Sequence, residues 1–336
     1  MIVSWGMESS RKTTDSLSQQ VSRQLTGFLQ PGHRLVVALS GGLDSVVLLH
    51  VLRGLRSDLD FRLSAVHVNH QLQSAANDWA AFCARLCRQW QIPCAEFVVT
   101  VIRQGGESLE AVARARRYEV LARQEAEWVA LAHHQDDQAE TVLLQLLRGA
   151  GLPGLQAMPA QRLLAPEGPC LVRPLLGVSR AVLHRYAVAQ DLEWVEDPSN
   201  RDPRHARNFL RQRVGPLLDE AFPAWRATLS RSARHLAQAQ AVLEDLSAQD
   251  GQQVSDEQGL KVAALHSLTE ARAIHLLRWW IRQQGAPACS ERRLQEILRQ
   301  GKARPDHHPE IHWAGWTLVR RQGYWRISPP VGRDSS

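Results

Sequence analysis

Residues 35–52 read LVVALSGGLDSVVLLHVL, and this stretch decides the fold. A short apolar run is followed by two adjacent glycines and then by a second, longer apolar run. The first run is typical of a buried strand, the glycines of a tight turn and the second run of a helix. The stretch therefore predicts a strand, a phosphate-binding loop and a helix, in that order.

The loop itself is SGGLDS, residues 40–45. Its glycines lack a Cβ, so their amides can approach an anion closely, and the positive end of the next helix faces the same place. A Walker loop would add a lysine that reaches the β- and γ-phosphates. Here Asp44 stands instead, and an aspartate suits a magnesium ion that bridges a leaving pyrophosphate. The alternative is a plain Gly-Gly turn with an N-capping aspartate.

Short apolar runs alternate with helix-like segments through the first two hundred residues. This alternation predicts a Rossmann-like α/β domain, in which helices cover both faces of a parallel sheet and ligands bind at the carboxyl ends of the strands. The expected strands are Arg34–Leu39, Phe61–Val68, Ala95–Val101, Trp128–Ala132 and Cys170–Pro174.

The pattern changes after Asn200. Residues 205–248 read as long helices, and a small mixed region follows, with helices near 268–284 and 290–300 and a terminal hairpin. We therefore expect three parts: a nucleotide-binding α/β domain over 24–220, a helical linker over 221–250 and a small α+β C-terminal domain over 251–330.

Composition narrows the class of protein. The chain has 336 residues, a formal net charge of +6 and a pI near 9.4, which mildly favours a polyanionic partner. Its five cysteines include no Cys-x-x-Cys pair, so neither a disulfide scaffold nor a zinc site is indicated. The sequence shows neither a signal peptide nor an apolar run long enough to cross a bilayer, so we expect a cytoplasmic protein without a membrane partner.

Polar residues gather where the expected strands end. His67, Asn69 and His70 close the second strand, near the expected nucleotide. Arg114 and Arg117 then share one face of a helix with Glu110. Either Glu110 and Arg114 form only a surface ion pair, or the two arginines bind phosphate.

The stretch HHQDDQAE, residues 133–140, is the densest in chemistry. Asp136, Asp137 and Glu140 fall within about 100° of one helix face, directly after His133 and His134. Acids in a first helical turn are favoured by the helix dipole alone. Three of them beside two histidines also fit a magnesium site or a pocket for a cation, and less well a transition-metal site.

Arginines crowd residues 201–213, after a Pro-rich turn. They are either one face of a solvated helix or contacts to the phosphate backbone of a nucleic acid.

These motifs together resemble the lysidine synthetase family of PP-loop ATP pyrophosphatases. The resemblance spans residues 34–217 in the expected order. It rests on SGGLDS (40–45), HVNHQL (67–72), ExxARxxRY (110–118), AHHxDDQAET (132–141), RPLL (173–176), DPSN (197–200) and RNFLR (207–211).

The resemblance implies an activity. Such enzymes use ATP to adenylate the C2 oxygen of the wobble cytidine in an isoleucine tRNA with a CAU anticodon. They then join free L-lysine to C2 and release AMP.

The resemblance also implies roles for single residues. Asp44, Arg114 and His133 would be catalytic, with Asp44 also holding Mg²⁺, while Asp137 and Glu140 would bind lysine and Arg117, Arg207 and Arg211 would bind tRNA. The ATP site would comprise Ser40, Gly41, Gly42, Leu43, Asp44, Ser45 and His67.

Two alternatives remain open. A PP-loop tRNA thiolase would need catalytic cysteines, for which the Cys83-x3-Cys87 spacing is a poor fit. A non-catalytic tRNA-binding protein with a relic nucleotide fold would not need the intact loop and acids. A homodimer is compatible with the sequence.

Overall fold

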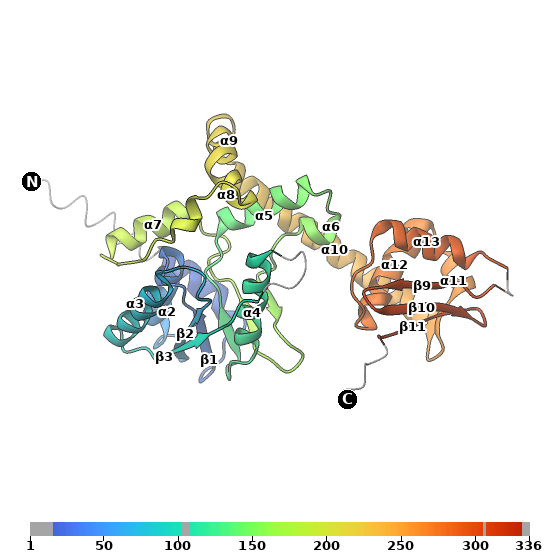
Figure 1. The fold of residues 1–336 in the computed structure, drawn as a ribbon, viewed down its shortest axis with the longest axis horizontal. Helices are drawn as coiled ribbons and strands as arrows, with labels where there is room; N and C mark the ends of the chain where they lie inside the picture. The colour runs from blue at the N-terminus through green and yellow to red at the C-terminus, as the bar shows by residue number, and fades with distance from the viewer. Residues whose placement is uncertain (1–15, 103–107, 305–306, 331–336) are drawn as a thin grey trace, which may run out of the picture. The chain divides into compact units, whose positions relative to one another are not determined.

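The computed structural model describes residues 16–102, 108–304 and 307–330, apart from the side chains of residues 200 and 201 (Figure 1). The chain divides into two compact units, residues 1–234 and 235–336. The first unit contains a six-stranded sheet and the second a five-stranded sheet.

The sheet of the first unit has the strand order β3-β2-β1-β4-β6-β5. Its strands are β1 (Arg34–Ala38), β2 (Arg62–Asn69), β3 (Cys94–Val98), β4 (Trp128–Ala130), β5 (Gln161–Leu163) and β6 (Cys170–Val172). All neighbours are parallel except β5 and β6. The five expected strands are therefore confirmed, with shifted ends. The antiparallel edge strand β5 was not expected, because its residues Gln161–Leu163 are exposed and form no apolar run.

Helices cover both faces of this sheet, as Figure 1 shows. The helices along this part of the chain are a helix over residues 16–26, α2 (Leu43–Leu55), α3 (Ala76–Gln89), α4 (Leu109–Ala122), α5 (Gln135–Leu147), α6 (Leu152–Leu155) and α7 (Arg180–Ala189). Strand β1 is apolar on both sides: Leu35 and Val37 join the core under α2, α3 and α7, and Val36 joins the core under α4. A strand buried on both faces reads as a continuous apolar run, which is why residues 34–39 were recognisable.

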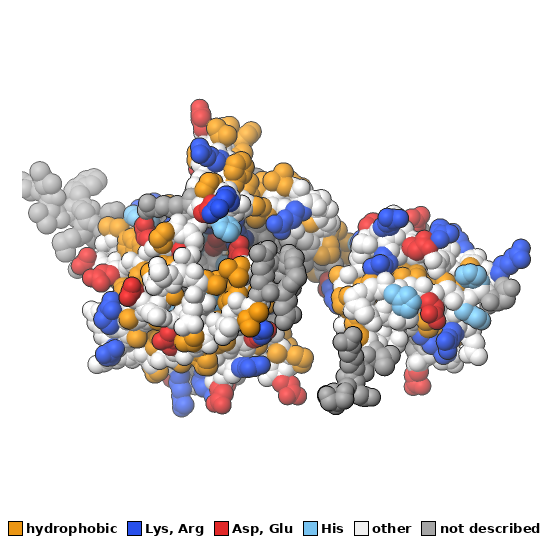
Figure 2. Space-filling view, in the orientation of Figure 1, with side chains coloured by type: hydrophobic (Ala, Val, Ile, Leu, Met, Phe, Trp, Pro, Cys, Tyr) orange, Lys and Arg blue, Asp and Glu red, His pale blue; other side chains and the backbone are white. Residues whose placement is uncertain are grey.

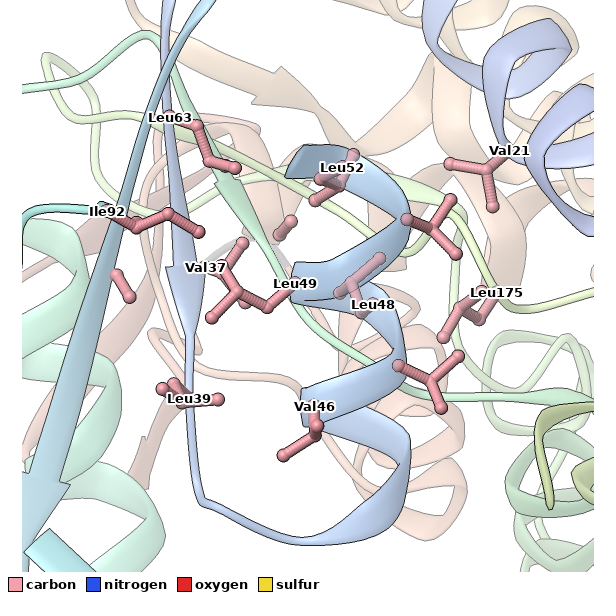
Figure 3. Close-up of a cluster of buried hydrophobic side chains, with 14 of the residues drawn as sticks. Val21, Val37, Leu39, Val46, Leu48, Leu49, Leu52, Leu63, Ile92 and Leu175 are labelled. Atoms are coloured by element: carbon pink, nitrogen blue, oxygen red, sulfur yellow. The ribbon is translucent and has the colours of Figure 1, made fainter. Parts of the chain in front are cut away.

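Helix α2 is the centre of the larger core (Figure 3). Leu48, Leu49 and Leu52 are fully buried against β1 and against Val21 of the first helix. Burial of each such leucine contributes about 1.5–3 kcal/mol relative to exposure. The packing fixes the start of α2, and with it the loop that precedes this helix.

A helical segment follows the sheet. It contains a 3-10 turn η1 (Pro198–Arg201), α8 (Ala206–Phe209), a π-helical stretch η2 (Leu210–Val214), α9 (Gly215–Ala221) and α10 (Trp225–Val254). A π-helical turn is rare and often marks a functional site. This one carries Arg211.

The second unit pairs an antiparallel sheet, in the order β7-β8-β11-β10-β9, with helices on an apolar core. Its elements are β7 (Ser255–Asp256), β8 (Gly259–Lys261), α11 (Val262–Ser267), α12 (Glu270–Gln283), α13 (Glu291–Gly301), β9 (Glu310–Trp313), β10 (Trp316–Arg321) and β11 (Tyr324–Ser328). The expected terminal hairpin is β10–β11. Within the described part of the chain, no helix is long and apolar enough to cross a membrane.

The loop before α2 gives a first prediction. Gly41 has a φ of +85°, and a Cβ there would lie 2.9 Å from Val195 Cγ2. Gly41→Ala should therefore cost about 1–3 kcal/mol, a loss of several degrees in melting temperature by thermal denaturation. Gly42→Ala is the matched control, because its nearest neighbour would be 3.6 Å away. Equal melting of the two variants would show that the left-handed turn is not the constraint.

Candidate active site

Hydrogen bonds among its own residues shape the SGGLDS loop. The Ser45 hydroxyl donates to the Gly42 carbonyl at 2.9 Å and accepts from the Ser40 amide at 3.2 Å. The Gly41 carbonyl accepts from the Val195 amide at 2.9 Å, which braces the loop from outside. The two serines therefore fix the shape of the loop, and the Ser40 hydroxyl also accepts from the Gly42 amide at 3.4 Å.

The beginning of α2 is left uncapped. Gly42 is the N-cap residue, and no side chain among the described residues accepts its first-turn amides. Free N–H groups at a helix start, together with the helix dipole, form an anion site. The expected ATP residues 40–45 thus come together around such a site.

His67 supports this loop from below. It is buried at the carboxyl end of β2, and its Nδ1 lies 2.9 Å from the Leu39 carbonyl oxygen. The contact joins β2 to the residue that precedes Ser40, so the structure places His67 beneath the loop.

Four carboxylates, Asp44, Asp136, Asp137 and Glu140, form what we call the acidic cluster. The buried ring of His134 lies among them: its Nε2 is 3.6 Å from Asp44 Oδ2 and 3.4 Å from Asp137 Oδ2. Burial alone would lower the pKa of His134, but Asp44 and the other acids together raise it. His134 thereby connects the phosphate loop to α5.

His134 also begins α5. Its side chain accepts from the Asp137 amide, and the Asp137 carboxylate accepts from the His134 amide at 3.1 Å. This reciprocal capping explains why acids and a histidine stand together at this helix start. The sequence contained His134 but gave no reason to prefer it over His133.

Two arginines expected to bind tRNA contact the two acids expected to bind lysine. Arg211 donates to both oxygens of Glu140, at 2.7 Å and 2.9 Å, and lies 3.4 Å from Asp137 Oδ1. Arg207 donates to the Thr141 hydroxyl at 2.8 Å and lies 3.5 Å from Glu140. Figure 2 shows basic and acidic side chains side by side in the recess below α8.

Asn208 positions these arginines. Its side-chain amide donates to the carbonyls of Ser199 and Asp202, both at 2.9 Å, and so fixes the Pro-rich turn against α8. Arg207 and Arg211 are thereby aimed at α5. The motifs DPSN and RNFLR are parts of one clamp.

Asp136 serves a different purpose from its neighbours. It accepts from the Arg180 amide at 2.9 Å and lies 2.9 Å from Nε of Arg226 in α10. Arg226 was not identified from the sequence, because 90 residues separate it from its partner. Both Asp136 oxygens are engaged, so Asp136 connects the start of α5 to α7 and α10.

The pKa values of Asp137 and Glu140 are shifted in opposite directions. Burial alone would raise the pKa of Asp137, but His134, His133 and the His134 amide lower it. Burial raises the pKa of Glu140, and Arg211 offsets this only in part. Two neighbouring carboxylates with divergent pKa values suit different roles in one reaction.

His133 lies at the end of β4, beside arginines. Its Nδ1 accepts from Nε of Arg173 at 3.1 Å, so the neutral ring carries its proton on Nε2. Burial lowers the pKa of His133 to about 3, with Arg173, Arg114 and Arg117 acting in the same direction against Asp137. The structure therefore brings Arg114 and Arg117 to the same edge of the sheet as His133.

A magnesium ion fits the residues near the loop. Asp44 Oδ1 is buried without a hydrogen-bond partner among the described residues. Those residues contain no group of three or more His, Cys, Asp or Glu side chains arranged to hold a metal. Magnesium usually takes one or two carboxylates and completes its shell with phosphate and water. Asp44 matches that requirement as a single carboxylate.

The Cys83-x3-Cys87 pair does not provide a reactive thiol. Burial raises the pKa of Cys83 to about 12, and contact with Cys94 together with burial raises the pKa of Cys87. Thiols protonated at neutral pH are poor nucleophiles and poor metal ligands.

The parallel sheet, the uncapped α2 and the lysine-free loop define a PP-loop domain. Consistent with this, the family model described as "PP-loop domain" matches residues 14–218, and the model "TilS substrate binding domain" matches residues 260–325. A U34-tRNA thiolase, NcsA from Methanococcus maripaludis, shares the fold with a TM-score of 0.58 at 17% identity, over 68% of this chain and 80% of that one.

Curated relatives narrow the class. The chain is 44% identical to a tRNA(Ile)-lysidine synthase of Nitrosomonas europaea, over 84% of this chain and 62% of the relative. It is 43% identical to the Serratia proteamaculans enzyme of that name, over 90% of this chain and 70% of the relative. The chain therefore belongs to the tRNA(Ile)-lysidine synthase family. The chain spans 62%, 64% and 65% of the length of three relatives that carry this name, the Nitrosomonas europaea protein among them.

The contacts of His133 predict that it stays neutral at working pH. In an NMR titration of ¹³C-labelled histidines, its ring should show no protonation between pH 8 and 5, and His133→Gln identifies the signal. Because folding lowers the pKa of His133 from 6.5 to about 3, the neutral ring stabilises the fold above pH 6.5. That contribution to stability is lost as the pH falls from 6.5 towards the folded-state pKa of about 3. A ring that titrates near 6.5 would contradict the assignment.

Proposed function

We propose that this chain joins free L-lysine to C2 of the wobble cytidine in an isoleucine tRNA with a CAU anticodon. Membership of the family supports the activity. The observation that carries the proposal is an open anion site at the start of α2 beside an acidic cluster bridged by His134. An anionic nucleotide and a cationic amine each find their complement at one edge of the sheet.

ATP is the first substrate. The amides of residues 40–45 bind its phosphates, and His67 supports that loop from below. Asp44 would hold Mg²⁺, which when bound neutralises charge on the phosphates. The C2 oxygen of the cytidine attacks the α-phosphorus and pyrophosphate leaves. Adenylation turns a poor leaving oxygen into a good one, and the base must be unstacked to expose it.

Lysine is the second substrate. Asp137, whose pKa is lowered, stays ionised and attracts the lysine cation. Glu140, whose pKa is raised, is suited to take the proton that the ε-amine must lose before it attacks C2. AMP then leaves. With its proton on Nε2, the neutral ring of His133 can donate a hydrogen bond to the substrate; this is its proposed role in proton transfer.

The arginine contacts imply an exchange of partners. Arg207 and Arg211 neutralise Asp137 and Glu140 in the free protein. On the arrival of tRNA they turn to backbone phosphates and leave the carboxylates to lysine. Arg114 and Arg117 stabilise negative charge near the α-phosphate or the anticodon loop.

The remaining assignments follow from the activity. The PP-loop domain spans residues 24–220, the linker 221–250 and the tRNA-binding C-terminal domain 251–330. The substrate is a cytoplasmic tRNA, so the protein works in the cytoplasm. A homodimer is compatible with this scheme.

A direct test supplies the protein with tRNA, ATP, Mg²⁺ and lysine. Mass analysis of the anticodon nucleosides should find lysidine, and the nucleotide products should be AMP and pyrophosphate. Both products should depend on tRNA. ADP and free phosphate as the main products would defeat the proposal.

Variants separate the two steps. Asp44→Asn should abolish pyrophosphate release and lysine transfer alike. Asp137→Asn or Glu140→Gln should spare tRNA-dependent pyrophosphate release and slow lysine transfer about ten- to hundredfold, since each charge-assisted contact contributes about 1.5–3 kcal/mol. Pyrophosphate release without lysine, followed by incorporation across a lysine series, measures both.

Glu244→Gln in α10 is a control, because that acid pairs with Arg282 in the second unit. If Asp137 and Glu140 variants lost adenylation as fully as Asp44→Asn, these acids would serve magnesium or ATP and not lysine.

A further inference from the structure

Tyr118 of α4 is surrounded by arginines. The guanidinium carbons of Arg114 and Arg162 lie 5.0 Å and 4.7 Å from the centre of its ring. Arg114 also donates to the Tyr118 hydroxyl at 3.2 Å, and Arg173 lies close enough to Tyr118 for the two groups to affect each other's pKa. Arg162 stands on β5, so three separate elements meet at this ring.

These arginines lack an acidic partner in the part of the chain that the structure describes. Among residues 16–102, 108–304 and 307–330, no carboxylate forms a salt bridge with Arg114, Arg162 or Arg173. The arginines of the neighbouring clamp, by contrast, are each paired with an acid. The uncompensated charge is therefore particular to this place and not a general property of an arginine-rich chain.

The uncompensated charges repel one another. Burial lowers the pKa of Arg173, and Arg162 and Arg114 act in the same direction, against Tyr118. Burial alone would raise the pKa of Tyr118, but the surrounding arginines together lower it. Like charges held together cost stability unless an anion joins them. Stacking on a ring keeps the guanidinium groups oriented for such an anion.

Within the sheet, Arg162 lies far to the side of the phosphate loop. Strand β5 is separated from β1 by β4 and β6. Three strand spacings amount to about 14 Å, while the loop follows β1 directly. The site nevertheless shares the edge of the sheet with His133, to which Arg173 donates. An anion beside the reacting base but away from ATP is a phosphodiester of the RNA.

We propose that Arg162, Tyr118, Arg114 and Arg173 bind a backbone phosphate of the substrate RNA, close to the nucleotide that is modified. The inference rests on the proposed function for the identity of the RNA. Of the four, Arg162 and Tyr118 are its distinctive members, because neither was expected from the sequence to bind anything. The site would hold the RNA backbone in place while the base to be modified enters beside the acidic cluster.

Arg162→Gln tests the site without removing a contact to an acid. Binding of an unmodified tRNA(Ile) transcript with a CAU anticodon is measured by fluorescence anisotropy over a salt series. Loss of one phosphate contact should lower the salt slope by about one and weaken binding about tenfold at low salt. Arg162→Lys should keep most of the slope.

Arg116→Gln is the matched control. Arg116 lies on α4 as well, but it pairs with Glu119 at 2.8 Å, so its loss should leave both affinity and slope unchanged. The melting temperature of Arg162→Gln should equal or exceed that of the unmodified protein, because a repulsive charge has been removed. A merely structural arginine would instead lower it.

Two results would overturn the proposal. One is wild-type tRNA affinity and slope in Arg162→Gln together with a lower melting temperature. The other is a raised KM for ATP with unchanged tRNA binding, which would assign the anion to the nucleotide. Failure of the wider function would look different, because the unmodified protein would then bind tRNA without forming lysidine.

Discussion

The balance of charge at the carboxyl edge of the sheet is the constraint on which the site depends. Four carboxylates and an uncapped helix start lie within reach of one another, and each needs a partner of opposite charge. His134 provides the first link, since its buried ring faces Asp44 on the loop and Asp137 on α5. Arg211 and Arg226 provide the others from segments far along the chain. The helical segment after the sheet is therefore part of the site.

The acids in this region are paired within the protein, whereas some of its positive groups are not. This difference indicates where ligands bind. The acids are neutralised by the protein, so a cationic substrate must displace an arginine that already contacts Glu140 through both oxygens. The arginines around Tyr118 and the free amides of α2 remain without acids among the described residues, so anions enter without competition. In the proposed reaction, the free protein is therefore prepared for nucleotide and RNA before it is prepared for lysine.

Local patterns carried most of the fold. Strand β1 could be predicted because both its faces are buried, and α2 because glycines precede a long apolar run. The three-residue β5 could not, since its pairing depends on β6 and not on its own residues. The same limit applies to the site. The motif around residues 133–140 showed that acids gather there, but 71 residues separate Arg211 from Glu140, and only the folded chain shows that they pair.

Contacts between segments far apart in the chain also explain why two arginines, Arg211 and Arg162, have different roles. Arg211 and Arg162 are both arginines, and sequence alone gives them the same chemistry. Arg211 follows an Asn208-anchored turn that directs it onto an acid, whereas Arg162 stands on an edge strand and rests on an aromatic ring. The first arginine must leave its partner to bind a phosphate, and the second has no acid to leave. A guanidinium without an acidic partner loses less on contact with RNA, so the edge strand is the better place for a permanent hold on the backbone.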